Sequence, residues 1–215
     1  LSLAQGEYLS FLDADDFYEP EYIALMSEPL INGDAQLSFC KYKEYLGEKV
    51  IAETPLEVTA LYNNDFIEHL LHIDKVHNMS LMYDVKALAE NELCFLTGCP
   101  NGEDRMFVVA ASFYLIAAFV PHYLYSYIYR ENSASRMYIS YEKLFLMLDG
   151  YLQQEEYFLS KEQTPRTQLY LKYADKEILG VENNIRRQLW ADLKNQKYDQ
   201  VLDVLNSYKQ RYGKP

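Results

Sequence analysis

The sequence predicts an α/β protein, a mixed β-sheet body followed by a C-terminal helical extension. Strand-like and helix-like segments alternate as far as residue 136, whereas from Tyr138 onward apolar residues recur at helical spacing. Residues 7–12 read as a strand with apolar side chains on both faces, which is typical of an interior strand of a parallel sheet. We therefore expect an α/β part at 1–136 and a helical extension at 137–215.

The individual elements are predicted from turn residues and hydrophobic periodicity. Pro20 stands between two glutamates and is expected to open a helix that continues to about Met26. The tripeptide Asn32-Gly33-Asp34 is expected to form a turn. The other expected elements are strands at 36–45 and 48–58, a helix at 63–72, a strand at 78–83, a helical turn at 85–89, a helix at 103–113 and β-rich segments at 115–120 and 123–129.

Composition and charge narrow the class of protein. The 215 residues carry a net charge of −12, which argues against a nucleic-acid-binding protein. The three cysteines form no Cys-x-x-Cys pair, so neither a disulfide framework nor a zinc site is expected, and a reducing, cytoplasmic setting fits. Residues 181–215 differ, because they hold seven basic and four acidic side chains. Such a tail either makes peripheral contact with an anionic membrane or is simply solvated, and the sequence leaves both open.

The stretch FLDADD at residues 11–16 places three carboxylates, those of Asp13, Asp15 and Asp16, directly behind the first expected strand. In open α/β sheets, ligands bind beyond the carboxyl ends of the strands. Like charges about 4 Å apart repel by roughly 4 kcal/mol at a surface-like dielectric, and a divalent cation removes that cost. Carboxylate oxygens suit Mg²⁺ or Mn²⁺. The spacing therefore predicts a metal site, with an acidic cap of the next helix as the equal alternative.

Two other kinds of acidic site do not fit the residues around FLDADD. An EF-hand loop beginning at Asp13 requires a polar ligand, a glycine and a glutamate at its fifth, sixth and twelfth positions. The chain has Phe17, Tyr18 and Ala24 at these positions. A glycoside hydrolase needs carboxylates on the two sides of the bond that it cleaves, and adjacent aspartates cannot flank a bond.

Two further segments carry groups of chemical interest. Glu103 and Asp104 stand at the start of an expected helix, where exposed N–H groups keep a carboxylate ionised, as a general base requires. A plain helix cap is the alternative there. In the segment 121–136, the planar guanidinium of Arg130 is suited to hold a phosphate. His122, in the same segment, is interpreted as structural.

Three pieces of sequence occur in an order that resembles the family 2 glycosyltransferases of the GT-A fold. They are GEYLSFLDADDFYEPEYI, then NGEDRMF, and then YLYSYIYRENSAS, and together they span roughly residues 1–136. The first piece is the most specific, because the strand, the Asp-x-Asp-Asp motif and the proline-led helix all agree. The resemblance implies a partial GT-A, Rossmann-like mixed sheet. It also implies an inverting, metal-dependent transfer of a sugar from a nucleotide-diphosphate donor to a hydroxyl acceptor.

The resemblance further implies roles for individual residues. Asp15 would hold a Mn²⁺ or Mg²⁺ ion on the donor diphosphate, while Asp13 would face the donor ribose or the metal. Asp104 would be the catalytic base, Glu103 would bind the acceptor, and Arg130 would assist the diphosphate leaving group. The implied partners are a nucleotide-diphosphate sugar and a glycan or lipid-linked acceptor. The implied setting is bacterial surface polysaccharide synthesis in the cytoplasm, at the inner face of the membrane.

One departure from the family pattern supports a rival hypothesis. Family members begin with a Val/Ile-rich strand and a nucleotide-binding segment, whereas this sequence starts at Leu1 within the helix that precedes the acidic strand. We therefore expect a fragment or one part of a split protein, which by itself binds a sugar nucleotide weakly. The rival is a non-catalytic remnant or interaction module in which the acids only cap helices.

Overall fold

The protein is represented by a computed structural model, which describes residues 3–54, 66–68, 77–98, 102–130 and 139–213. Its contacts divide it into two compact units. The first unit consists of Leu1–Phe95 and Asp104–Met137, and the second consists of Leu96–Glu103 and Tyr138–Pro215.

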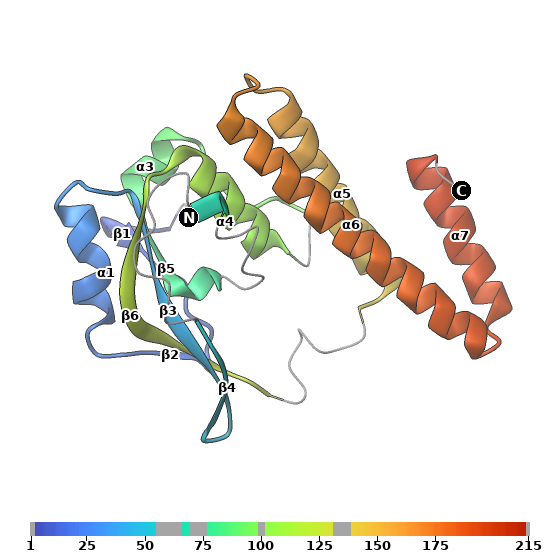
Figure 1. The fold of residues 1–215 in the computed structure, drawn as a ribbon, viewed down its shortest axis with the longest axis horizontal. Helices are drawn as coiled ribbons and strands as arrows, with labels where there is room; N and C mark the ends of the chain where they lie inside the picture. Colours follow the sequence, from blue (N-terminus) through green and yellow to red (C-terminus); the bar gives the residue numbers. More distant parts are fainter. Residues whose placement is uncertain (1–2, 55–65, 69–76, 99–101, 131–138, 214–215) are drawn as a thin grey trace. The chain divides into compact units, whose positions relative to one another are not determined.

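The first unit is built on a mixed sheet that has six strands within the described residues, in the order β1-β5-β3-β6-β2, with β4 paired to β3. The strands are β1 (Tyr8–Leu9), β2 (Phe17–Tyr18), β3 (Leu37–Leu46), β4 (Lys49–Glu53), β5 (Leu81–Asp84) and β6 (Ala117–Ile128). The long strands β3 and β6 run parallel, side by side (Figure 1). The pairs β1–β5, β2–β6, β3–β4 and β3–β5 are antiparallel. The expected α/β class with a mixed sheet is confirmed.

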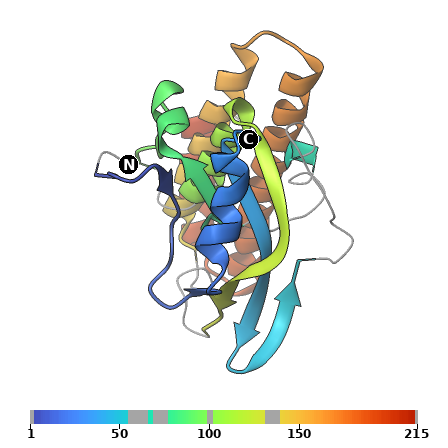
Figure 2. The ribbon, with the colours of Figure 1, turned by 90° about the vertical axis from the view of Figure 1, so that its left-hand side faces the viewer.

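Helices cover both faces of this sheet (Figures 1 and 2). On one face, α1 (Tyr22–Ile31) buries Tyr22, Met26 and Leu30, spaced four residues apart, in a core that includes Cys40 of β3 and Val120 of β6. On the other face lies α4 (Glu103–Tyr114). Two shorter elements flank β5, the 3₁₀ helix η1 (Asn78–Ser80) before it and α3 (Val85–Glu90) after it.

The expectation for residues 7–12 is wrong in one respect. Only Tyr8–Leu9 form a strand, and this strand pairs antiparallel with β5 at the edge of the described sheet. Both residues are half-buried. The apolar pattern of the segment has another cause, because Phe11 packs edge-to-face against Tyr83 and Phe107 instead of continuing the strand.

The expected β-rich segments 115–120 and 123–129 form one continuous strand, β6. Its register against β3 places Cys40 opposite Val120 and Lys41 opposite Tyr123, so that two residues of β6, Pro121 and His122, bulge out of the ladder. Both are exposed. A proline without an N–H group is tolerated at such a bulge, which is why the strand continues through it. The expected helix at 63–72 lies mostly outside the described residues.

The second unit contains the expected C-terminal helices, α5 (Tyr141–Leu159), α6 (Pro165–Lys194) and α7 (Tyr198–Tyr212). The Ser140 hydroxyl accepts the N–H of Lys143 at the start of α5, and the Thr164 hydroxyl accepts the N–H of Thr167 at the start of α6. Aromatic side chains from α5 and α6 fill the core between them, namely Tyr151, Phe158, Tyr170 and Tyr173. No described helix is both long and apolar enough to cross a membrane.

Asp192 joins the three helices of the second unit, and it is only 4% exposed. Its carboxylate accepts hydrogen bonds from the hydroxyl of Tyr141 on α5 at 2.8 Å and from Nζ of Lys197, before α7, at 3.0 Å. The side-chain amide of Gln200 on α7 adds a third, at 3.3 Å. The hydrogen bonds from Lys197 and Tyr141 lower the pKa of Asp192 below its usual value.

We expect Asp192→Asn to lower the free energy of unfolding by about 2 kcal/mol at neutral pH, because hydrogen bonds to a charged acceptor are lost. Since the folded pKa lies below the unfolded value of 3.8, this contribution is present above that value and disappears as the pH falls through the folded pKa. Urea denaturation at pH 7 and about pH 3 measures the difference. Asp203→Asn, at an exposed position of α7, is the control. Equal stability of Asp192→Asn and the wild type at pH 7 would contradict the role of Asp192.

Candidate functional site

The acidic stretch forms a tight turn between β1 and β2. The backbone N–H of Asp16 donates to the carbonyl of Asp13 at 3.1 Å. The hydroxyl of Tyr18 lies 2.5 Å from the carbonyl oxygen of Phe11 and 2.8 Å from that of Met79. Burial raises the pKa of Tyr18 to about 12, so the hydroxyl remains a donor at neutral pH. The turn is thereby tied to η1, directly before β5.

Asp16 is the buried member of the acidic stretch, with 9% exposure. The hydroxyl of Tyr125 donates to its Oδ2 at 2.5 Å, and the backbone N–H of Ile128 donates to its Oδ1 at 2.8 Å. Burial, followed by this hydrogen bond, raises the pKa of Tyr125 well above its usual value. Both carboxylate oxygens of Asp16 accept hydrogen bonds from β6, so Asp16 holds the turn against the sheet. Neither oxygen is oriented towards a ligand.

Asp15 is paired with a cation of the chain. Its Oδ2 lies 3.1 Å from Nε of Arg130, two residues beyond the end of β6. Both side chains remain partly open to solvent. The structure thus pairs Asp15, the expected metal ligand, with Arg130, the residue expected to assist the diphosphate. Their ion pair is accessible to a ligand.

Asp13 carries the charge that the turn compensates least. Partial burial raises the pKa of its carboxyl, and the carboxylates of Asp16, Asp15 and Asp104 raise it further. The imidazole of His77 acts in the opposite direction. No ion pair of Asp13 is present among the described residues. Asp13 is therefore the position at which an added cation would relieve the most repulsion.

An aromatic cluster brings Asp104 near this turn. Phe107 follows Asp104 by one helical turn, on the same face of α4. Its ring packs against Phe11 at 6.2 Å and stacks on Phe95 at 4.4 Å. Since Phe11 is two residues before Asp13, the cluster places the start of α4 within electrostatic range of the acidic turn. Two carboxylates that are distant in the sequence thus repel each other in the fold, which contributes to the raised pKa of Asp13.

The boundary between the two units lies between Glu103 and Asp104. The contacts of Glu103 assign it to the second unit, and those of Asp104 assign it to the first. One carboxylate oxygen of Glu103, Oε2, is buried and has no hydrogen-bond partner among the described residues. A buried carboxylate oxygen without a donor is costly. The two serines that follow Arg130 in the segment YLYSYIYRENSAS, Ser133 and Ser135, lie outside the described residues.

The carboxylates of the turn suit a divalent cation that is shared with a phosphate ligand. Within the described residues, no three His, Cys, Asp or Glu side chains are grouped closely enough to hold a metal by themselves. Mg²⁺ usually binds through one or two carboxylates, keeps several waters and completes its shell with substrate phosphates. Asp13 and Asp15 provide hard oxygen ligands at an exposed turn with unrelieved negative charge, which fits such a site.

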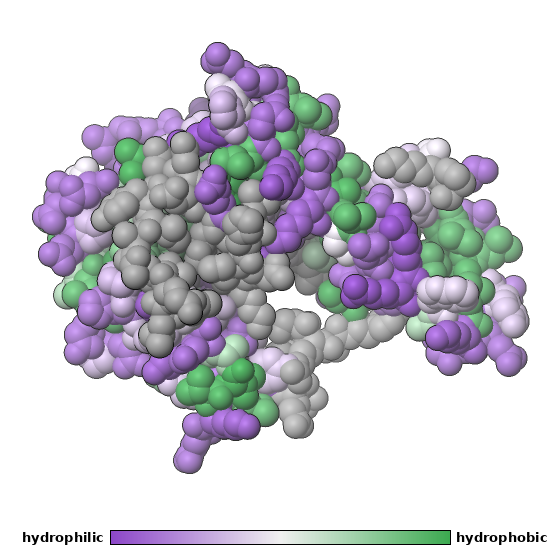
Figure 3. Space-filling view, in the orientation of Figure 1, coloured by the Kyte–Doolittle hydropathy of each residue, from purple (hydrophilic) through white to green (hydrophobic). Residues whose placement is uncertain are grey.

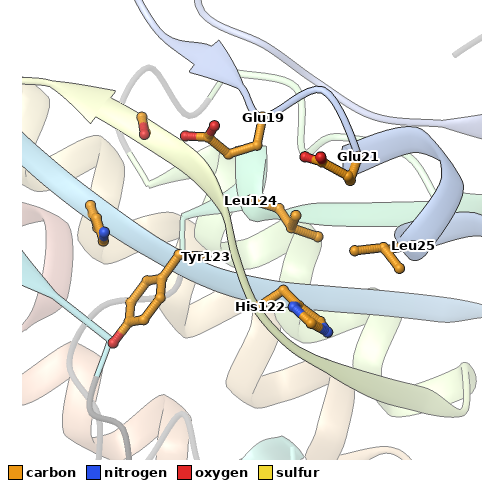
Figure 4. A pocket seen from close by; sticks show the side chains of 8 residues that line it. Glu19, Glu21, Leu25, His122, Tyr123 and Leu124 are labelled. Carbon is orange, nitrogen blue, oxygen red and sulfur yellow. The ribbon is translucent and has the colours of Figure 1, made fainter.

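A separate groove lies along β6 and the start of α1 (Figure 4). It has a volume of about 530 Å³, and Glu19, Glu21 and His122 are among its lining residues. It contains none of the residues that the sequence proposed for catalysis or metal binding. The acidic turn is therefore distinct from this groove.

Sequence reasoning missed two features of the site. It grouped Asp16 with the other two aspartates, although β6 engages both of its oxygens. It also passed over His77, which lies near Asp13. The only signal in the sequence was the abundance of tyrosine, because Tyr125 provides the partner of Asp16 and tyrosine rings surround His77.

Comparisons with known proteins agree with this architecture. Residues 1–85 match the family model "Glycosyl transferase family 2". An uncharacterized glycosyltransferase of Haemophilus influenzae is 26% identical over 145 residues, which cover 64% of this chain and 45% of that protein. The crystal structure of S. aureus TarS 1–349 in complex with UDP-GlcNAc matches with a TM-score of 0.61 at 17% identity, over 98% of this chain and 59% of that one. A structure of S. aureus TarS gives a TM-score of 0.56 at 15% identity, over 85% of this chain and 29% of that one.

The fold is that of a GT-A protein, as the resemblance implied. Residues 1–85 are similar to the family 2 glycosyltransferases, and the Haemophilus influenzae relative carries the same similarity further along the chain. It spans about half the length of the relatives that it matches.

The different environments of Asp13 and Asp16 give opposite predictions for stability. We expect Asp16→Asn to lower the free energy of unfolding by about 1–3 kcal/mol, because the amide cannot accept both hydrogen bonds from β6. Asp13→Asn should maintain or raise stability, because it removes like-charge repulsion. Urea denaturation without divalent cations compares the two variants.

The pH dependence of the wild type provides the control for Asp13. Because the folded pKa of Asp13 is raised above 3.8, its destabilising charge is relieved as the pH falls through the folded pKa, and Asp13→Asn should lack this gain. If Asp13→Asn proves less stable than Asp16→Asn at neutral pH, the assignment of the two roles is wrong.

Proposed function

We propose that this chain forms the metal- and acceptor-side part of an inverting glycosyltransferase that transfers a sugar from a nucleotide-diphosphate donor to a hydroxyl group of a glycan or lipid-linked acceptor. The observation that carries the proposal is the proximity of Asp104 to Asp13, at a turn where Asp15 pairs with Arg130. A general base beside a cation site is what the proposed transfer requires. The similarity of residues 1–85 to the family 2 model and the UDP-GlcNAc in the similar TarS structure support a nucleotide-sugar donor.

In the proposed reaction, the carboxylate of Asp104 accepts the proton of the acceptor hydroxyl, and the acceptor oxygen attacks the anomeric carbon. The bond from that carbon to the diphosphate oxygen breaks, and the configuration inverts. Glu103 binds the acceptor, in keeping with its buried oxygen, for which the described residues provide no donor. Arg130 moves from Asp15 to the negative charge that develops on the diphosphate.

Asp13 and Asp15 would hold Mn²⁺ or Mg²⁺ at the turn. When bound, such an ion supplies positive charge that stabilises the departing diphosphate. Arg130, which pairs with Asp15, would compete with the ion for this carboxylate.

The proposal includes a setting in the cytoplasm, at the inner face of a bacterial membrane, in surface polysaccharide synthesis. The second unit supports the membrane contact, because α7 exposes Tyr198, Leu202 and Leu205 along one flank. A hydrophobic area over α7 is visible in Figure 3. The surplus of basic residues at 181–215 would attract an anionic headgroup.

We expect Asp15→Asn to weaken Mn²⁺ binding by at least about tenfold, because one of two carboxylate ligands is lost. Arg130→Ala should strengthen binding in the absence of diphosphate, since the guanidinium competes for the same carboxylate. Isothermal titration calorimetry measures both, with Asp199→Asn on α7 as an exposed control. Unchanged binding in Asp15→Asn would instead support a non-catalytic interaction module.

In sugar-transfer assays, Asp104→Asn should reduce kcat at least about 100-fold while donor affinity stays the same, because only proton removal from the acceptor is lost. Asp34→Asn, in the exposed turn after α1, is the matched control. Turnover that persists in Asp104→Asn would remove this residue as the base. Loss of donor affinity together with turnover would indicate a binding role.

A further inference from the structure

The helix α6 has an outer side that the fold of the second unit leaves uncovered. Its inner side packs against α5 and α7 (Figure 1). The buried residues of that inner side include Tyr170, Tyr173, Ala174, Val181, Ile185 and Asp192. Residues two positions apart lie roughly 200° apart around a helix axis, so Trp190 points away from Asp192. Trp190 is accordingly 66% exposed, although tryptophan is the largest apolar side chain.

Residues at helical spacing extend this outer side along α6. Lys172, Leu179, Arg186 and Leu193 follow one another at intervals of seven residues, which is close to two turns, so they lie on one side of the helix. Trp190 belongs to the same side, because it stands four residues after Arg186 and three before Leu193. Leu179 is 53% exposed and Leu193 is 36% exposed. This surface, which we call the α6 stripe, consists of Lys172, Leu179, Arg186, Arg187, Trp190, Leu193 and Lys194.

The α6 stripe is basic, in a chain whose net charge is −12. Arg187 and Lys194 are exposed, and neither forms an ion pair with another described residue. Arg186 pairs with Glu182 at 3.1 Å, yet 62% of its side chain remains exposed. On α6, which the structure describes over its whole length, Asp175 is the only exposed acidic residue. Cationic side chains therefore surround exposed apolar ones.

This combination matches the surface of a bilayer that contains anionic lipids. Tryptophan rings favour the boundary between headgroups and hydrocarbon, because the ring is apolar and its N–H group stays in the polar layer. Lysine and arginine side chains are attracted to anionic headgroups. From Lys172 to Lys194 the stripe is about 33 Å long, and a helix can lay such a stripe on a flat surface. A soluble polyanion would need only the cations, and the exposed Trp190 would have no role.

We propose that the α6 stripe is a membrane-contact surface. The helix lies parallel to the plane of an anionic bilayer, Trp190 and Leu193 enter the headgroup region, and Arg187 and Lys194 bind lipid phosphates. This inference rests on the proposed function for its setting at a membrane, and it names a lipid-facing surface in addition to the flank of α7. It accounts for an exposed tryptophan that stands among basic residues on a side that the fold does not cover.

Trp190 is the single tryptophan of the chain, so its fluorescence reports the contact in the unmodified protein. The probe is a vesicle of phosphatidylglycerol and phosphatidylcholine, and a vesicle of phosphatidylcholine alone is the control. With the anionic vesicle, the emission should shift to shorter wavelength and be quenched less by acrylamide, because the ring leaves water. The neutral vesicle should cause no shift. The response should weaken as salt is added, because salt screens the attraction to the headgroups.

Co-sedimentation with the same vesicles measures the contribution of the side chains. Arg187→Gln combined with Lys194→Gln should weaken binding by at least about tenfold, because two headgroup contacts are lost. Trp190→Ser should weaken it by about tenfold. Lys49→Gln combined with Lys86→Gln removes the same charge at exposed positions of the first unit and should leave binding unchanged. Circular dichroism verifies that each variant is folded.

The outcomes separate this inference from the proposed function. If anionic vesicles leave the Trp190 emission unchanged, the α6 stripe is overturned as a membrane contact. Co-sedimentation that persists in this case and is lost in Leu202→Ser would retain the contact through α7. An equal shift with soluble polyphosphate would overturn the bilayer as the partner, and a shift that grows with protein concentration without vesicles would assign the stripe to a second copy of the chain. Sugar transfer in Asp104→Asn is measured without vesicles, so it tests the proposed reaction independently.

Discussion

The mutual repulsion of three aspartates within four positions is the constraint on which the site depends. The fold gives each carboxylate a different environment. Asp16 is buried against β6 and satisfied by Tyr125 and Ile128, while Asp15 meets Arg130 at the surface. Asp13 has no ion-pair partner among the described residues, and partial burial, followed by the neighbouring carboxylates, raises its pKa. The turn is therefore held together by one aspartate and leaves the other two available for a ligand.

Tyrosine side chains connect this turn to the rest of the first unit. Tyr18 and Tyr22 stack on each other with centroids 3.5 Å apart, and their hydroxyls reach backbone carbonyls of η1 and β5. Tyr125 engages Asp16 from β6. A tyrosine supplies a large apolar ring and a hydroxyl donor in one residue, so it fills the core and satisfies polar groups at its rim. This dual use accounts for much of the tyrosine in the first unit.

Candidate functional groups come from three separate segments. The aspartates precede β2, Asp104 is the second residue of α4, and Arg130 follows β6. The link to α4 depends on packing of Phe107 against Phe11 and Phe95, and the link to β6 depends on the hydrogen bonds of Asp16. A substitution in the aromatic cluster would therefore move the candidate base without touching any charged residue.

Part of this arrangement could be predicted from the sequence alone. Hydrophobic periodicity and turn residues predicted the mixed α/β body and the C-terminal helices, because these signals are local. The FLDADD and NGED motifs identified Asp13, Asp15 and Asp104, because their residue types and order resemble one family. The roles of these residues in metal binding and catalysis stay predictions.

The tertiary structure alone decided how the charges are shared. The sequence does not distinguish Asp16 from its neighbours, since Tyr125 and Ile128 are more than a hundred positions away in the chain. It also indicates neither the Glu44–His77 pair nor the ion pair of Asp15 with Arg130. Residues 7–12 were misread as an interior strand because an apolar pattern does not reveal what it packs against, and here Phe11 packs against rings brought in by β5 and α4. The sequence by itself determined which chemical groups this protein has, whereas long-range packing decided which of them became neighbours, because electrostatic and hydrogen-bonding partners depend on distance in space and not along the chain.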